Sequence, residues 1–118
     1  MIPALTCLLL PFTGPCTQYV RGVPRIADIL QHRSEYTGQT MSVTGRVRRL
    51  AQRHTKSGFA YEIFFLCDSG CIHVYVKGRS PIHEEQLVTV RGTYYETLRQ
   101  ERRTYVNEVE ATEVLPRE

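Results

Sequence analysis

The sequence predicts an all-β fold, a small five-stranded barrel preceded by one short helix. Apolar and polar residues alternate with a period of two in several separate segments, as in strands with one buried face. Clusters of turn residues separate these segments. Glycine stands inside two of them, at Gly45 and Gly92, where a strand can bend round a small barrel. An SH3-like barrel or a small open sandwich would also fit the number of strands.

The helix is predicted at 23–33 and the first strand at 41–48. Pro24 suits a first helical turn, and the apolar residues that follow it recur at helical spacing. The pair Thr37-Gly38 ends this pattern. We therefore expect one short amphipathic helix before the barrel.

The strongest local signal is the stretch 59–77. Two runs rich in aromatic and β-branched residues flank Asp68-Ser69-Gly70, so the stretch predicts two antiparallel strands joined by a tight turn. Asp68 is interpreted as a turn residue that bonds its own backbone. In the second strand the residues expected to face the core are Ile72, Val74 and Val76, and those expected to face solvent are Cys71, His73, Tyr75 and Lys77. The solvent face is therefore aromatic and basic.

The remaining segments complete the five strands. A polar, basic loop at 51–58 joins the first strand to the hairpin. A connection with at most one helical turn is predicted at 78–85, and the fourth strand at 87–95. A second charged loop, 97–103, leads to the fifth strand at 105–114.

The chain of 118 residues fits one domain, and we divide it into an N-terminal arm, 1–22, and a barrel domain, 23–118. Apolar residues make up 42% and charged residues 23%, so neither a disordered nor a membrane-embedded protein is indicated. The net charge is only +3, but 46–103 holds 11 Lys and Arg against 6 acidic residues, whereas 104–118 holds one Arg against four Glu. The basic middle fits a nucleic-acid partner. A GC-rich genome, which favours Arg over Lys, explains the abundance of Arg equally well.

The N-terminal arm begins with an apolar run that prolines interrupt. The run is shorter than the about 20 apolar residues that a transmembrane helix needs. No basic residue precedes it, and Pro15 stands before Cys16, where a signal peptide would have a small cleavable residue. We therefore predict a cytoplasmic protein without an integral membrane segment, whose arm packs on the domain or on a second copy of it. Export is the alternative.

Cys67 and Cys71 bracket the turn of the central hairpin. They could face each other closely enough for a disulfide or for half of a metal site. Cys7 and Cys16 do not supply a second metal-binding pair, and the four histidines lack the spacing of metal ligands. We therefore predict reduced thiols in a cytosolic host, no bound metal and no cofactor.

Four segments resemble the OB-fold nucleic-acid-binding domains, a family that includes anticodon-binding-like and replication-protein-A-like modules. They are YTGQTMSVTGRV (36–47), YEIFFLCDSGCIHVYVKG (61–78), QLVTVRGTYYE (86–96) and NEVEATEV (107–114), and the range from the first to the last of them covers about two thirds of the chain. The resemblance implies that ligands bind on the outer face of the second and third strands. It also implies that two loops flank this face, one joining strands one and two and the other joining strands four and five.

The positions implied by the resemblance coincide with aromatic and basic residues. On the strands they are Tyr61, Phe65, His73, Tyr75 and Lys77, and in the loops they are Arg53, His54, Lys56, Arg99, Arg102 and Arg103. We add Arg46, Arg48 and Arg91 as phosphate contacts, because a barrel gathers separate segments onto one side. Tyr61 and Tyr75 are the candidate stacking platforms, and a cross-strand pair that only stabilises the hairpin is the alternative. For the basic residues the alternative is a solvated face.

The sequence carries no signature of catalysis, since it has no glycine-rich phosphate loop, no HExxH motif and no nucleophile elbow. We therefore predict a binding module and not an enzyme. The predicted partner is single-stranded DNA or RNA, bound with little sequence specificity. The alternative is an exported or envelope-associated OB-fold protein that binds a protein partner.

Overall fold

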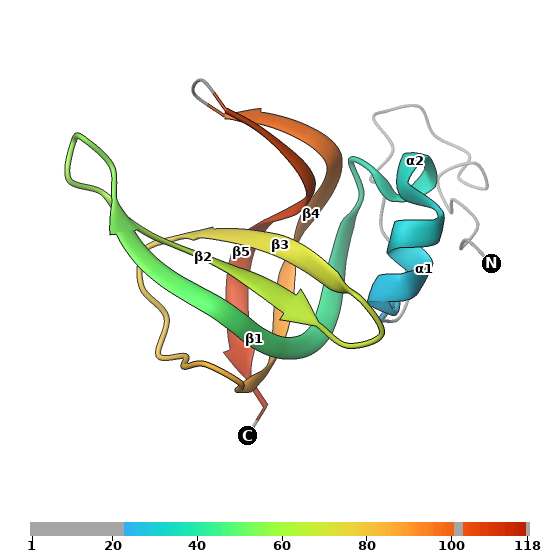
Figure 1. The fold of residues 1–118 in the computed structure, drawn as a ribbon, viewed down its shortest axis with the longest axis horizontal. Coiled ribbons are helices and arrows are strands. Elements are labelled where there is room, and N and C mark those ends of the chain that lie inside the picture. Colours follow the sequence, from blue (N-terminus) through green and yellow to red (C-terminus); the bar gives the residue numbers. More distant parts are fainter. Residues whose placement is uncertain (1–22, 101–102, 118) are drawn as a thin grey trace, which may run out of the picture.

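The computed structural model describes residues 23–100 and 103–117, in which five strands form a closed barrel (Figure 1). The strands are β1 (Thr40–His54), β2 (Ala60–Cys67), β3 (Cys71–Lys77), β4 (Leu87–Gln100) and β5 (Arg103–Pro116). Two short helices, α1 (Ile26–Gln31) and α2 (Arg33–Tyr36), precede them. The prediction of an all-β, OB-type barrel with a short N-terminal helix is confirmed. In the described part of the chain, no helix is both long and apolar enough to cross a bilayer.

The strands follow one another round the barrel in the order β1-β2-β3-β5-β4, and β4 returns to β1. Every neighbouring pair is antiparallel except β3 and β5, which run parallel. β1 pairs with two neighbouring strands because it is long and bends. Its first half pairs with β4 and its second half pairs with β2, and Arg46 at the bend lies opposite both Cys67 and Leu87.

Gly45 lies where β1 passes closest to β2. A Cβ atom at this position would stand 2.8 Å from the carbonyl oxygen of Cys67 and 3.0 Å from Cγ of Leu66. A backbone oxygen in a strand ladder cannot move aside without disturbing the ladder, so the position requires glycine. A bend or bulge was predicted at both glycines; the bulge of β1 lies instead between Arg48 and Ala51, whereas the irregularity in β4 falls at the second predicted position, between Arg91 and Gly92.

The core fills the inside of the barrel and the space under the helices. Its largest side chains are Tyr94 and Phe64, and α1 adds Ile26 and Ile29, all of them fully or almost fully buried. The helix predicted at 23–33 is divided in two, because the backbone of His32 (φ −134°) leaves the helical region between α1 and α2.

The turn between β2 and β3 holds the start of α1. Its Asp68 bonds its own turn, as predicted, through the amide of Ser69. In addition the amide of Ile26 donates to Oδ2 of Asp68 (3.4 Å), and the amide of Ala27 donates to Oγ of Ser69 (3.2 Å). These first amides of a helix have no partner within the helix itself, so the turn supplies acceptors that α1 lacks.

Two segments predicted as loops are largely strand. β1 continues to His54 and pairs with β2 as far as Ala60, so the loop predicted at 51–58 shrinks to residues 55–59. β4 continues to Gln100, where it pairs with Arg103, so most of the loop predicted at 97–103 is strand as well. Polar residues suited these positions because the paired strands extend beyond the barrel as two hairpin arms (Figure 1). We call them the β1–β2 arm (residues 51–60) and the β4–β5 arm (residues 97–100 and 103–106).

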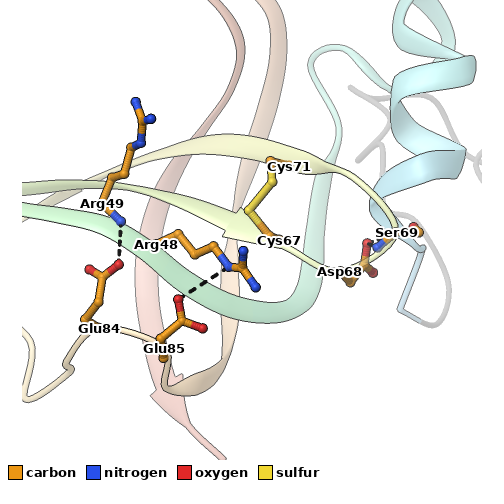
Figure 2. Close-up of a disulfide and its surroundings, with 8 residues drawn as sticks. All are labelled: Arg48, Arg49, Cys67, Asp68, Ser69, Cys71, Glu84 and Glu85. Carbon is orange, nitrogen blue, oxygen red and sulfur yellow. Dashed lines mark hydrogen bonds and ion pairs between the residues drawn. A yellow bond between two sulfur atoms is a disulfide. The ribbon is translucent and has the colours of Figure 1, made fainter.

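A β-bulge in β1, between Arg48 and Ala51, interrupts its pairing with β2. At the bulge Arg49 has a positive φ of 56°, and Glu84 holds the distorted backbone. Its Oε2 accepts from the amide of Arg49 (2.9 Å) and its Oε1 from the amide of Leu50 (3.0 Å). Figure 2 shows the first of these bonds beside the ion pair between Arg48 and Glu85. The connection between β3 and β4 thus fixes the bulge of β1.

We expect Glu84→Gln to destabilise the protein at neutral pH and to lose its effect in acid. Hydrogen bonds from the amides of Leu50 and then Arg49 hold the pKa of Glu84 below its usual value. A carboxyl whose pKa is lower in the folded state contributes stability above its unfolded pKa, and this contribution is lost as the pH falls through the folded pKa. Urea unfolding of the wild type and of Glu84→Gln should therefore give a difference in the free energy of unfolding that becomes smaller as the pH falls from 7 to 3.

The neighbouring variant Glu85→Gln is the matched control for Glu84→Gln. Glu85 pairs with Arg48 on an exposed surface, where ion pairs contribute little to stability. Equal destabilisation by the two variants, or a difference for Glu84→Gln that is independent of pH, would contradict the role assigned to Glu84.

Cys67 and Cys71 form a disulfide across the turn of the hairpin (Figure 2). The prediction of reduced thiols is wrong for this pair. The register between β2 and β3 sets the two residues directly opposite each other, with Cα atoms 4.1 Å apart, so the sulfur atoms meet. The bridge therefore ties together the two strands whose turn holds α1.

Replacing both Cys67 and Cys71 by Ser should lower the free energy of unfolding by about 2 kcal/mol, the chain-entropy value for so short a loop. The bridge encloses a sequence separation of only 4 residues, so a larger loss is not expected. The measurement is urea unfolding of the oxidised wild type, the wild type with reductant, and the double variant. A reductant that leaves the unfolding midpoint of the wild type unchanged would contradict the prediction.

Candidate nucleic-acid interface

The outer face of β2 and β3 carries an aromatic floor. Side chains alternate along both strands, and the core-facing positions, such as Phe64 and Val74, are buried. The outward positions are Tyr61, Ile63 and Phe65 on β2, and His73, Tyr75 and Lys77 on β3. The predicted orientations are confirmed, including that of Phe65, which is 37% exposed beside the buried Phe64. We call the outward set Tyr61, Phe65, His73 and Tyr75 the aromatic floor.

The rings of the aromatic floor contact one another in two pairs. Tyr61 and Tyr75 have ring centroids 5.3 Å apart and planes tilted by 31°. Phe65 and His73 meet edge to face at 5.4 Å, with planes 70° apart. The Tyr61–Tyr75 contact agrees with a pair that stabilises the hairpin. It also leaves both tyrosines half-exposed on a common surface.

Basic side chains border the floor on the side of β1. Cross-strand register sets Arg53 opposite Tyr61, and Arg48 opposite Phe65. Residues directly opposite on neighbouring strands share a face, so these exposed arginines stand beside the rings. Arg46 follows on the same face of β1, and Lys77 lies opposite Tyr61 on the other side. Four predicted cations are thus brought together with the floor.

The loop of the β1–β2 arm is held in one shape by hydrogen bonds around Thr55. The amide of Thr55 donates to the carbonyl of Phe59 (2.8 Å), and the Thr55 hydroxyl accepts from the amide of Phe59 (3.0 Å). Lys56 is exposed on this loop, and His54 before it lies 3.2 Å from a guanidinium nitrogen of Arg79. Phe59 is 71% exposed. Sequence reasoning missed Phe59 as a site residue, although an aromatic residue directly after Gly58 was a signal for it.

The remaining predicted cations lie elsewhere or beyond the described residues. Arg99 is exposed on the β4–β5 arm. The backbone of Arg103 belongs to β5, whereas Arg102 lies outside the residues that the structure describes. Arg91 lies between Ser42 of β1 and Glu113 of β5, on the wall that β4 forms. Because β4 neighbours neither β2 nor β3, the structure does not bring Arg91 to the aromatic floor.

The opposite border of the floor, formed by β5, is acidic. Parallel register sets Glu108 beside His73 and Glu110 beside Tyr75. Glu108 is fully buried, and its Oε1 accepts a hydrogen bond from Nδ1 of His73 (2.9 Å). Sequence reasoning missed Glu108, because nothing local marks it as buried. The floor therefore has one basic and one acidic side.

The described residues contain no group of three or more His, Cys, Asp or Glu side chains placed to bind a metal ion. The side chains of the interface are aromatic rings, cations and separate carboxylates. The rings can stack on other flat rings, and the cations can bind phosphate groups.

Comparison with known proteins supports the fold. No protein-family model matches the chain, and no curated protein matches it either. Among solved structures, the chain is similar to a putative aspartyl-tRNA synthetase from Leishmania major Friedlin, with a TM-score of 0.59 and 16% sequence identity. The match covers 81% of this chain but only 20% of the synthetase. This similarity agrees with an OB-type barrel.

Proposed function

We propose that the protein binds single-stranded DNA or RNA across the aromatic floor, with little sequence specificity over most of the contact. The observation that carries the proposal is the set of outward rings on β2 and β3 bordered by exposed arginines of β1 and by Lys77. Aromatic rings stack on any base, and nearby cations meet the backbone. The similarity to an aspartyl-tRNA synthetase is compatible with such a partner.

The charges of the two borders suggest how the strand would lie. Phosphates would follow the basic border, near Arg48 and Arg53, because these guanidinium groups offer forked donors suited to phosphate. The bases would then turn toward β3 and the acidic border at β5, where phosphates are repelled. Phe59, held at the tip of the β1–β2 arm, is placed to stack on a base beyond the floor.

Tyr75→Ala should lower the affinity for a labelled single-stranded oligonucleotide by about 1–3 kcal/mol, the usual cost of losing one stacking ring. The side chain faces outward from β3, so the fold should persist. The measurement is an anisotropy titration, after thermal melts show similar stability. Equal affinities, or a variant that merely unfolds, would mean that Tyr75 serves the sheet and that the binding face lies elsewhere.

Lys77→Ala should weaken binding and reduce its dependence on salt. The logarithm of affinity for a single strand should fall with that of salt concentration by about 0.7 per neutralised phosphate, so the loss of one cation should lower the slope by about that amount. Arg91→Ala removes the same charge from the β4 wall and is expected to change the slope less. A flat salt response of the wild type would remove the electrostatic part of the proposal.

A second candidate function is that of an exported protein whose barrel binds a protein partner. The Cys67–Cys71 disulfide favours it, because structural disulfides persist mainly in oxidising compartments. Mass spectrometry of the mature N-terminus, on protein from the native host, tests it. Cleavage or lipid attachment at Cys16 would favour export, and an intact N-terminus with reduced Cys67 and Cys71 would exclude it.

A further inference from the structure

Two glutamate side chains, Glu62 and Glu108, have no exposed surface. Both oxygens of Glu62 are used, since Oε2 accepts from the side-chain amide of Gln52 (3.0 Å) and Oε1 from the amide of Ser80 (2.6 Å). Only Oε1 of Glu108 is used, by His73. Its Oε2 has no hydrogen-bond partner among the residues that the structure describes. Burying an acceptor without a hydrogen bond costs free energy and is rare in folded proteins, so we looked for a donor that this oxygen could bind.

Glu108 lies at a fork in the sheet. Over residues 108–111 β5 pairs with both β3 and β4, whereas the residues before Glu108, such as Val106, pair with β4 alone. The β4–β5 arm therefore leaves the barrel at this residue, and the carboxylate lies at the foot of the arm. Since Val109 next to it faces the core, Glu108 belongs to the outer side of the barrel, the side of the aromatic floor.

The ring of His73 covers the carboxylate on the side of the floor. The side chain of His73 is 17% exposed, and it is held by its bond to Glu108 and by the edge contact with Phe65. A base that stacks on Phe65 can reach the carboxylate by displacing this ring. The fork thus holds a buried acceptor beside the proposed path of the bases, separated from it by His73.

The chemistry of the oxygen selects the group that it can bind. A carboxylate oxygen only accepts hydrogen bonds, so its partner must be a donor. Cytosine presents an amino group at C4, and carboxylates accept from this group in known base recognition, whereas thymine and uracil present a carbonyl oxygen at the same position. An acceptor facing an acceptor would leave both unpaired.

We propose that the fork at Glu108 is a base-recognition subsite, in which Oε2 accepts a hydrogen bond from the exocyclic amino group of one base. The proposal rests on the proposed function and adds to it, among pyrimidines, a preference for cytosine over thymine or uracil at one position of the bound strand. At the other positions stacking remains tolerant of sequence.

The test compares fluorescein-labelled deoxyoligonucleotides of equal length, (dC)12 and (dT)12, at pH 7.5 and fixed salt. The wild type should bind (dC)12 about tenfold more tightly, as expected for one base-edge contact. An oligonucleotide in which 2-pyrimidinone, which has no group at C4, replaces cytosine should bind like (dT)12. Glu108→Gln should remove the preference for (dC)12, because one carboxylate acceptor is replaced by an amide donor.

Glu62→Gln is the matched control, because it changes a second buried carboxylate that has its full set of donors. It should keep the tenfold preference. Equal binding of (dC)12 and (dT)12 by the wild type overturns the subsite and leaves the proposed function intact. Absence of binding to every oligonucleotide overturns both. The comparison of oligonucleotides needs no variant, so equal binding by the wild type overturns the subsite even if Glu108→Gln fails to fold.

Discussion

Gly92→Ala is expected to lower the free energy of unfolding by about 3 kcal/mol or more, at the upper end of the usual cost of overpacking. A Cβ atom on Gly92 would stand 2.7 Å from Cα of Ala111 and closer still to the carbonyl oxygen of Glu110. All of these neighbours are backbone atoms of β5, so no side-chain rotation can relieve the contact. The bulge between Arg91 and Gly92 would have to move as a whole.

Gly70→Ala is the matched control for Gly92→Ala. A Cβ atom on Gly70 would meet Cδ1 of Leu30 at 3.1 Å, which is the far end of a flexible side chain. We expect this variant to lower the free energy of unfolding by less than about 1 kcal/mol, since the side chain of Leu30 can move aside. Urea unfolding of both variants and the wild type measures the difference. Losses of equal size would show that the approach of β4 to β5 does not depend on Gly92.

A side chain at residue 92 would also affect the candidate interface. Glu110 and Ala111, which a side chain at residue 92 would push, pair on their other side with Tyr75 and Val76 of β3. A shift of β5 would therefore displace the strand that carries half of the aromatic floor. Any Gly92 variant that remains folded is expected to bind single strands less tightly.

The orientation of the aromatic floor could be predicted from sequence because it depends on local alternation. Phe64 and Phe65 are adjacent, and the period of two in β2 decides which of them is buried. The same reasoning placed Tyr75 and Lys77 outside. Such predictions hold wherever one face of a strand is buried, since a slip of one residue would expose the whole core face.

Features that depend on distant pairing could not be predicted in this way. The burial of Glu108 follows from its parallel partner His73, which is 35 residues away in the sequence. The lengths of the two hairpin arms depend on how far the strands remain paired beyond the core, where the residues are polar and resemble those of a loop. The Cys67–Cys71 bridge required the register of the hairpin as well as the spacing of the cysteines.

Tyr94→Ala is expected to destabilise the protein by about 4 kcal/mol, in the range for removing an aromatic ring from a core. Tyr94 is the largest fully buried side chain of the described residues. Its hydroxyl donates a hydrogen bond to Oδ1 of Asn107 (2.7 Å), and Asn107 has a positive φ of 53° directly before the fork at Glu108. The ring fills the barrel, and the hydroxyl holds the kink from which the β4–β5 arm departs.

Tyr94→Phe separates these two roles, because it keeps the ring and removes the hydroxyl. The variant should lower the free energy of unfolding by about 1 kcal/mol, the usual contribution of one hydrogen bond.

Burial raises the pKa of Tyr94 to about 12. A group whose pKa is raised by folding contributes stability below its unfolded pKa of about 10, and this contribution is lost as the pH rises through 12. The wild type should therefore lose more stability than Tyr94→Phe between pH 9 and pH 11.5, measured by urea unfolding. Parallel pH profiles of the two proteins would show that the Tyr94 hydroxyl is not buried as described, and the kink at Asn107 would then need another support.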